Sequence, residues 1–249
     1  MYENTLSVPA EQKHIFDFVV TQLADSMSQI SALTVVTQSA DRLYYTYACD
    51  EVFRKVIGRD VTDVAARALS LGYKNLYLRR LLDVNDEDFF QNVLVDVICV
   101  FDSAVDAQAL TSVVRADKPL YLDGYYLFKM GAMKRKWSEL SQLVGANRYV
   151  LEDAELVLEF LQYLTEQSGG KRQKMSLILD ADGFCLFDGN NKLMPTVQTL
   201  ARRVCFEEEA VVNLVCNKPA KLTVYCKNAP SKMFVSAVSA LFDVNFVYV

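Results

Sequence analysis

The sequence predicts a mixed α/β protein with helical and α+β parts. Apolar residues alternate with polar ones near both ends of the chain, whereas they recur at helical spacing in the middle. A polar, glycine-bearing stretch over residues 168–174 separates the middle from the C-terminal part. We therefore expect three domains: a small N-terminal β-α-β-β unit (residues 1–57), a helical domain (58–168) and a C-terminal α/β domain (175–249).

The N-terminal β-α-β-β unit is expected to contain strands at residues 2–7, 33–37 and 43–48. Its helix is expected to start at Pro9, because proline is favoured in a first helical turn. In the middle, Asp60 and Asp63 suit the start of a helix, and residues 85–88 suit the start of another. A stripe over 123–144, a stop at Gly145 and a second stripe over 150–164 predict a helical hairpin.

The C-terminal part begins with a β-hairpin at Asp182-Gly183, since Asp-Gly is a strong hairpin signal. Residues 196–204 have helical spacing, and Glu207–Glu209 suit the first turn of a helix that runs to about Cys216. A strand at 222–226, a helix from Pro230 and a strand at 246–249 predict a parallel β-α-β unit.

Composition excludes several classes of protein. Hydrophobic residues make up 52% of the 249 residues and charged residues 23%, which is typical of a folded chain and not of a disordered one. The net charge of −5 provides no overall attraction to nucleic acid or to anionic membranes. The single histidine, His14, excludes zinc sites that need a histidine pair.

The chain is expected to be cytoplasmic. Its first residues lack the basic and apolar regions of a signal peptide, and the apolar stretch 233–249 is interrupted by Asp243 and Asn245. The six cysteines lie among apolar residues without a Cys-x-x-Cys pair, which favours buried, reduced thiols.

Two groups of residues are candidates for ligand binding. Asp180, Asp182 and Asp188 lie close together in sequence and offer hard oxygen ligands for a divalent cation, although their spacing does not fit an EF-hand. Ser231 and Lys232 begin a helix, where free N–H groups can bind an anion. The simpler interpretations are turn-forming aspartates and a solvated helix start.

A basic segment on the helical hairpin is the candidate site for a protein partner. Lys129, Lys134 and Arg135 accompany Trp137, which is the kind of large aromatic residue that anchors protein interfaces. Because Trp137 also falls on the apolar stripe, it is alternatively a core residue. Lys171, Arg172 and Lys174 add positive charge in the linker, so nucleic-acid binding stays an alternative.

Several segments resemble the YtxC-like sporulation proteins of endospore-forming bacteria. The segment Asp123-Gly-Tyr-Tyr-Leu-Phe-Lys-Met130 is similar to the family's D-G-F-x-x-F-R-L, although Lys129 stands in place of an arginine. Similar segments follow at 152–155, 159–163, 184–191, 209–225 and 242–246. The resemblance implies a cytosolic protein associated with sporulation, and it implies no known enzymatic activity.

We therefore expect a non-enzymatic cytoplasmic protein that acts through contacts with another protein, with no cofactor and no membrane association. The alternative from another class is a metal-dependent hydrolase or phosphoryl-transfer enzyme that uses Asp180, Asp182 and Asp188. The sequence leaves the partner and the oligomeric state open.

Overall fold

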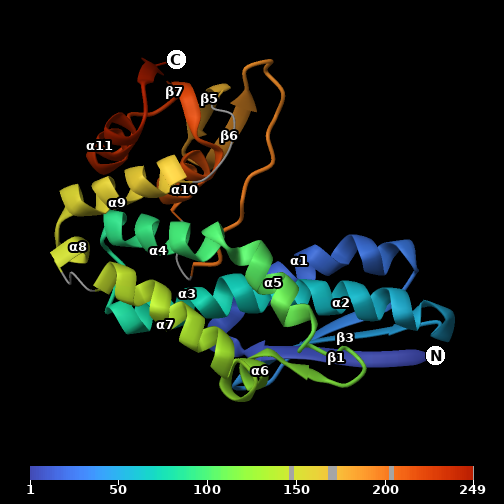
Figure 1. Cartoon of the computed structure of the whole chain (residues 1–249). Helices are drawn as coiled ribbons and strands as arrows, with labels where there is room; N and C mark the ends of the chain where they lie inside the picture. The colour runs from blue at the N-terminus through green and yellow to red at the C-terminus, as the bar shows by residue number, and fades with distance from the viewer. Residues whose placement is uncertain (146–148, 168–172, 202–204, 249) are drawn as a thin grey trace. The chain divides into compact units, whose positions relative to one another are not determined.

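The computed structural model describes residues 1–145, 149–167, 173–201 and 205–248 (Figure 1). The chain divides into two compact units, which are treated separately below. The first comprises Met1–Leu78, Asp102–Glu139 and Leu200–Arg202, and the second comprises Arg79–Phe101, Leu140–Thr199 and Arg203–Val249. Segments of the region 58–168 occur in both units, so the units do not follow chain order. The domain boundaries drawn from the sequence stay predictions.

The first unit contains a four-stranded mixed sheet with the order β2-β3-β1-β4. Strand β3 (Arg42–Cys49) is antiparallel to β1 (Tyr2–Pro9) and to β2 (Leu33–Gln38), while β4 (Leu120–Tyr121) is parallel to β1. With α1 (Lys13–Gln29) between β1 and β2, the predicted β-α-β-β unit is confirmed. The two residues of β4 are too few to produce an alternating pattern, so the sequence did not reveal that strand.

One face of the central strand β3 is buried, and its other face is half-buried. Along β3 every second residue is buried, including Tyr45 and Tyr47, and α1 packs against β1 and β3. The alternation arises because successive side chains of a strand point to opposite faces. Strand β2 differs, since all of its residues are exposed.

Helices complete the first unit. They are α2 (Arg54–Ala68), the N-terminal part of α3 (Lys74–Leu82), α5 (Ser103–Thr111), α6 (Leu122–Phe128) and much of α7 (Gly131–Gly145), with a π-helical turn η3 (Leu69–Tyr73) between α2 and α3. The prediction that the second helix starts at Asp60 was wrong, because α2 starts at Arg54. Asp50 accepts a hydrogen bond from the backbone N–H of Val52 at 3.1 Å and caps a short 3-10 turn that leads into α2.

The stripe over 123–144 belongs to two helices instead of one. Helix α6 ends where the N–H of Lys129 donates to the carbonyl of Tyr125 at 2.8 Å, and α7 begins at Gly131. Glycine in a helix interior is unfavourable relative to alanine, which favours a break there. The apolar pattern continues across the break because Leu122, Met130 and Trp137 are all buried.

The second unit holds another four-stranded mixed sheet, with the order β6-β5-β7-β8. The hairpin of β5 (Gln173–Asp180) and β6 (Gly183–Asp188) turns at Gly183, whose φ of 151° is rarely adopted by residues other than glycine. Strand β7 (Pro219–Cys226), α11 (Lys232–Leu241) and β8 (Val244–Tyr248) form the predicted parallel β-α-β unit. Both C-terminal predictions are confirmed.

The helices of the second unit are α4 (Phe89–Phe101), α8 (Tyr149–Glu152), α9 (Ala154–Gln167), α10 (Phe206–Asn217) and α11, together with the end of α3 and the end of α7. Helix α4 packs against α9 and α10. The link of the predicted helical hairpin over 146–148 and most of the linker over 168–172 lie outside the described residues.

The helix expected at 196–204 is absent over 196–201, and residues 202–204 lie outside the described part of the chain. Asn213 of α10 explains the difference, because its side chain pairs with the backbone of Val197. The N–H of Val197 donates to Asn213 Oδ1 at 2.6 Å, and Asn213 Nδ2 donates to the Val197 carbonyl at 3.1 Å. These bonds hold both backbone groups in a non-helical conformation.

None of the described helices is long and apolar enough to cross a membrane. The six cysteines are free thiols, and Cys185 on β6 is exposed.

Candidate functional site

An exposed apolar patch lies where α6 meets α7 in the first unit. Leu127 and Phe128 end α6 with 59% and 81% of their surface exposed. Lys129 follows them in the chain and is exposed, as is Arg135 on α7. We refer to Leu127, Phe128, Lys129 and Arg135 as the α6–α7 surface. Two large apolar side chains that are exposed side by side in the chain are one feature of binding surfaces.

The sequence identified the two cations of this surface but missed its apolar pair. Leu127 and Phe128 fall between Tyr126 and Met130, which carry the apolar stripe of the helix. Their positions could have revealed them, because large apolar residues that lie outside the apolar face of an amphipathic helix point toward solvent.

Lys134 has a different place from the other predicted cations. Its Nζ lies 3.9 Å from the centroid of the Tyr126 ring, and the side chain is half-buried. Burial also lowers the pKa of Lys134. The cation–π contact joins α7 to α6, so Lys134 helps to hold the two helices together.

Trp137 is fully buried and does not belong to the α6–α7 surface. Its Nε1–H donates to Asp106 Oδ2 at 2.9 Å, and its ring centroid lies 5.9 Å from that of Tyr77. Of the two interpretations of Trp137, the structure therefore supports the core residue.

Asp106 is the centre of a buried ionic network that the sequence did not reveal. Lys74 Nζ donates to Asp106 Oδ2 at 3.1 Å, and Lys136 Nζ donates to Asp106 Oδ1 at 2.6 Å. Both lysines also pair with Asp102, Lys136 at 2.9 Å. Lys74 and Asp106 are fully buried, so their charges must be paired to offset the cost of leaving water.

The hydrogen bonds of this network keep its carboxylates charged in a buried setting. Burial works against the charged form of Asp102, but the hydrogen bonds from Lys74 and Lys136 outweigh it and lower the pKa. Two carboxylates face two ammonium groups, so the charges balance. With Lys74 wholly inaccessible to solvent, a substrate cannot reach the amine.

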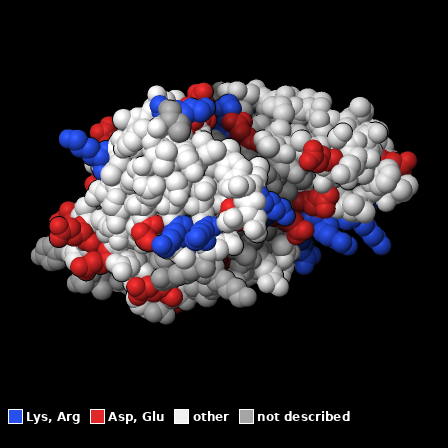
Figure 2. Space-filling view, turned by 90° about the horizontal axis from the view of Figure 1, so that it is seen from above, with Lys and Arg blue, Asp and Glu red and all other residues white. Residues whose placement is uncertain are grey.

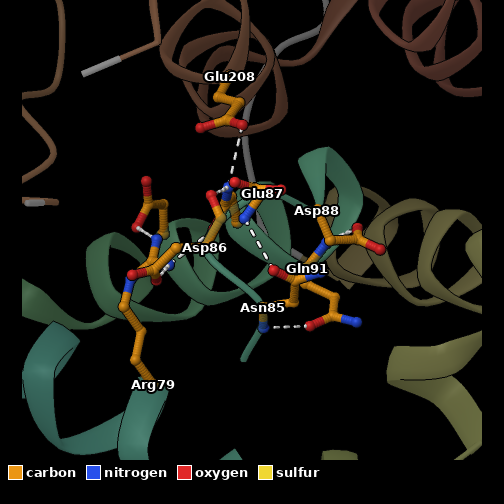
Figure 3. A network of polar contacts seen from close by, with 9 residues as sticks. Arg79, Asn85, Asp86, Glu87, Asp88, Gln91 and Glu208 are labelled. Atoms are coloured by element: carbon orange, nitrogen blue, oxygen red, sulfur yellow. Dashed lines mark hydrogen bonds and ion pairs between the residues drawn. The ribbon is translucent and has the colours of Figure 1, made fainter. Parts of the chain in front are cut away.

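A second polar network joins the α3–α4 connection to α10 within the second unit (Figure 3). Arg79 donates to Asn92 at 2.6 Å and to Asp86 at 3.0 Å. Asn92 in turn donates to the Asp86 carbonyl at 3.0 Å and to Glu208 at 3.1 Å. Figure 3 shows Glu208 directed toward this loop, and the hydrogen bonds tie the loop before α4 to α10.

The predicted anion site at Ser231 and Lys232 is filled by a carboxylate of the chain itself. Glu207 accepts a hydrogen bond from the Ser231 backbone N–H at 2.8 Å and another from the Ser231 hydroxyl. Ser231 Oγ also accepts from the Phe234 N–H at 3.1 Å, as an N-cap does. Lys232 is exposed, and the Ser231 groups that would bind an anion are already occupied by Glu207.

The three aspartates of the predicted metal site serve turns and an ion pair. Asp180 pairs with Lys227, and this hydrogen bond lowers its pKa. Asp188 accepts from the backbone N–H groups of Asn190 at 2.8 Å and Lys192 at 2.9 Å. In the part of the chain that the structure describes, no three acidic, histidine or cysteine side chains gather as metal ligands would.

An open groove of about 770 Å³ in the first unit carries charges of both signs. Arg54, Lys55 and Arg115 line it together with Glu51 and Asp117. Arg54 is already engaged, because it donates to Glu51 at 2.9 Å and lies 5.0 Å from the centroid of the Tyr2 ring. The groove is therefore a mixed polar surface without a set of groups directed at one reacting atom.

Basic and acidic side chains are interspersed on the face that Figure 2 shows. The described residues of that face form no continuous basic stripe of the kind that follows a phosphate backbone.

Comparison of the chain with models of protein families, with curated proteins and with solved structures finds no match.

Proposed function

We propose that this protein acts by binding another protein through the α6–α7 surface and that it catalyses no reaction. The observation that carries the proposal is the exposure of Leu127 and Phe128, with the exposed Lys129 next in the chain and the exposed Arg135 on the following helix. Burying a phenylalanine or leucine side chain contributes about 1.5–3 kcal/mol. Covering this pair would therefore supply much of the binding free energy of a weak to moderate complex.

The charge of the α6–α7 surface indicates what kind of partner segment would bind to it. Lys129 and Arg135 are exposed on this surface and pair with no carboxylate in the described residues. A partner segment that places an apolar side chain over Phe128 and carboxylates toward these cations complements it. The association with sporulation is part of the same proposal and rests on the resemblance of the sequence alone.

The alternatives have less support in the structure. Asp180 and Asp188 are engaged in an ion pair and a turn, and Trp137 and Lys74 are inaccessible. Binding through exposed apolar residues needs none of these side chains.

Affinity capture tests the proposal with a double substitution, Leu127→Ser with Phe128→Ser. Both residues are exposed, so the fold is expected to persist while recovery of the partner falls at least tenfold. The matched control is Val56→Ser with Val105→Ser, which removes two apolar residues of similar exposure, 55% and 62%, elsewhere in the first unit.

A charge reversal, Lys129→Glu with Arg135→Glu, separates the role of the cations from that of the apolar pair. Recovery is expected to fall several-fold at low salt and to recover in part as salt is added, because the reversed charges repel the partner's carboxylates and salt screens that repulsion. Equal recovery by the wild type, the apolar variant and the control variant would remove the α6–α7 surface as the binding site.

A further inference from the structure

The edge strand β2 lacks the features that normally protect a sheet edge. It pairs with β3 on one side and ends the sheet on the other. All of its residues, Leu-Thr-Val-Val-Thr-Gln, are exposed, with Leu33 at 71%, Val35 at 55% and Val36 at 54%. It contains no charge, no proline and no register shift. Such edges readily pair with another strand.

The hairpin turn shows which backbone groups of β2 are free. The N–H of Ser39 donates to the carbonyl of Arg42 at 2.8 Å, so Ser39 and Arg42 are a hydrogen-bonded pair. These pairs occur at every second position of an antiparallel ladder. The backbone groups of Leu33, Val35 and Thr37 therefore point to β3, and those of Thr34, Val36 and Gln38 point to the open edge.

We propose that β2 pairs in antiparallel fashion with β2 of a second copy of this chain, in a register centred on Val36. A two-fold axis that joins two antiparallel edges stands perpendicular to the sheet, so opposed residues must point to the same face. Val36 then lies opposite Val36 of the second copy, and Thr34 lies opposite Gln38. Every outward-pointing backbone group of β2 takes part in this register.

The neighbouring register, centred on Val35, is less favourable. It would place Gln38 opposite Ala32, whose N–H already donates to the carbonyl of Met27 at 3.0 Å. The bonds at both ends of the ladder would be incomplete. Centring on Val36 leaves no such group unpaired.

The side chains of β2 make a second copy a suitable occupant. In the proposed register valine meets valine, and threonine meets valine or glutamine, so no like charges are opposed. One strand is much smaller than a standard interface of about 1,600 Å², so the dimer is expected to be weak and dependent on concentration.

Sedimentation velocity of the full chain tests the proposal across a range from micromolar to millimolar concentration. The wild type is expected to shift from monomer to dimer. Val36→Lys is expected to stay monomeric because two lysines would meet, and so is Val36→Glu. An equimolar mixture of the two variants is expected to dimerise again. Val105→Lys, a charge placed on an exposed valine of α5, is the control and is expected to dimerise as the wild type does.

Amide hydrogen exchange of the wild type tests the register without any substitution. At low concentration, protection is expected at Val35 and Thr37 and not at Thr34, Val36 and Gln38. At high concentration, protection is expected to extend to these three amides. A monomer at every concentration would overturn the proposal, as would a dimer that Val36→Lys leaves intact. The Leu127→Ser/Phe128→Ser variant is expected to dimerise normally, so this test is independent of the proposed function.

Discussion

Asp106 shows how a buried side chain depends on several partners at once. It accepts hydrogen bonds from Trp137, Lys74 and Lys136. The sequence could not predict this arrangement, because the partners lie about thirty positions apart in the chain and share no motif. Only the packing of α3, α5 and α7 brings them together.

Asp106→Ala is therefore expected to be far more destabilising than Trp137→Phe. The first change leaves the fully buried Lys74 without one of its carboxylates, which costs on the order of 3–5 kcal/mol. The second removes one donor and leaves both lysines paired, which costs about 1–2 kcal/mol. Denaturant unfolding followed by circular dichroism measures both. Equal losses would mean that the network adds nothing beyond the indole hydrogen bond.

Arg42 and Asp123 predict a dependence of stability on pH. Arg42 donates to both carboxylate oxygens, at 2.7 and 3.0 Å, and this hydrogen bonding lowers the pKa of Asp123 from its ordinary 3.8. A carboxyl with a lower pKa in the folded state stabilises the fold above its unfolded pKa. That contribution is lost as the pH falls through the folded pKa.

The test compares the free energy of unfolding of the wild type and of Arg42→Met between pH 7 and pH 2. The variant is expected to be less stable by about 1 kcal/mol near neutral pH, and the difference is expected to vanish at the acid end. A difference that stays constant over the whole range would contradict the ion pair as its source.

At the scale of elements, local signals predicted much of the fold. The hairpin at Gly183 and the helix that starts with Glu207–Glu209 follow from the preferences of a few neighbouring residues. The helix expected at 196–204 was wrong because Asn213, far along the chain, binds the backbone of Val197. The break between α6 and α7 was missed because the apolar stripe continues across it.

Two glycines in neighbouring helical segments provide a matched pair of substitutions. A Cβ on Gly72 in η3 would lie 2.7 Å from Cδ1 of the buried Ile15, whereas a Cβ on Gly58 in α2 would meet nothing within 4 Å. Gly72→Ala is expected to destabilise the fold by about 1–3 kcal/mol through overpacking. Gly58→Ala is expected to be neutral or to stabilise it by up to about 1 kcal/mol.

Thermal unfolding of both glycine variants tests these two predictions. The midpoint is expected to fall for Gly72→Ala and to stay or rise for Gly58→Ala. If both midpoints rose, helix propensity and not the contact with Ile15 would govern this segment.

At the scale of the whole molecule, the sequence predicted the class of fold but not which side chains the fold exposes. The mixed α/β architecture is confirmed, with a four-stranded sheet in each unit. Exposure depends on how the elements pack, so the basic residues Lys129 and Arg135 were recognisable and the apolar pair beside them was not. The proposed function rests on that pair.

Photo-crosslinking from residue 128 tests the proposed function most directly. A photoreactive phenylalanine analogue replaces Phe128 in one protein and the exposed Val52 in the control, and both are irradiated in the cell of origin. The proposal predicts a discrete crosslinked protein from position 128 that position 52 does not capture and that Lys129→Glu with Arg135→Glu weakens. The same products from both positions, or none from position 128, would contradict it.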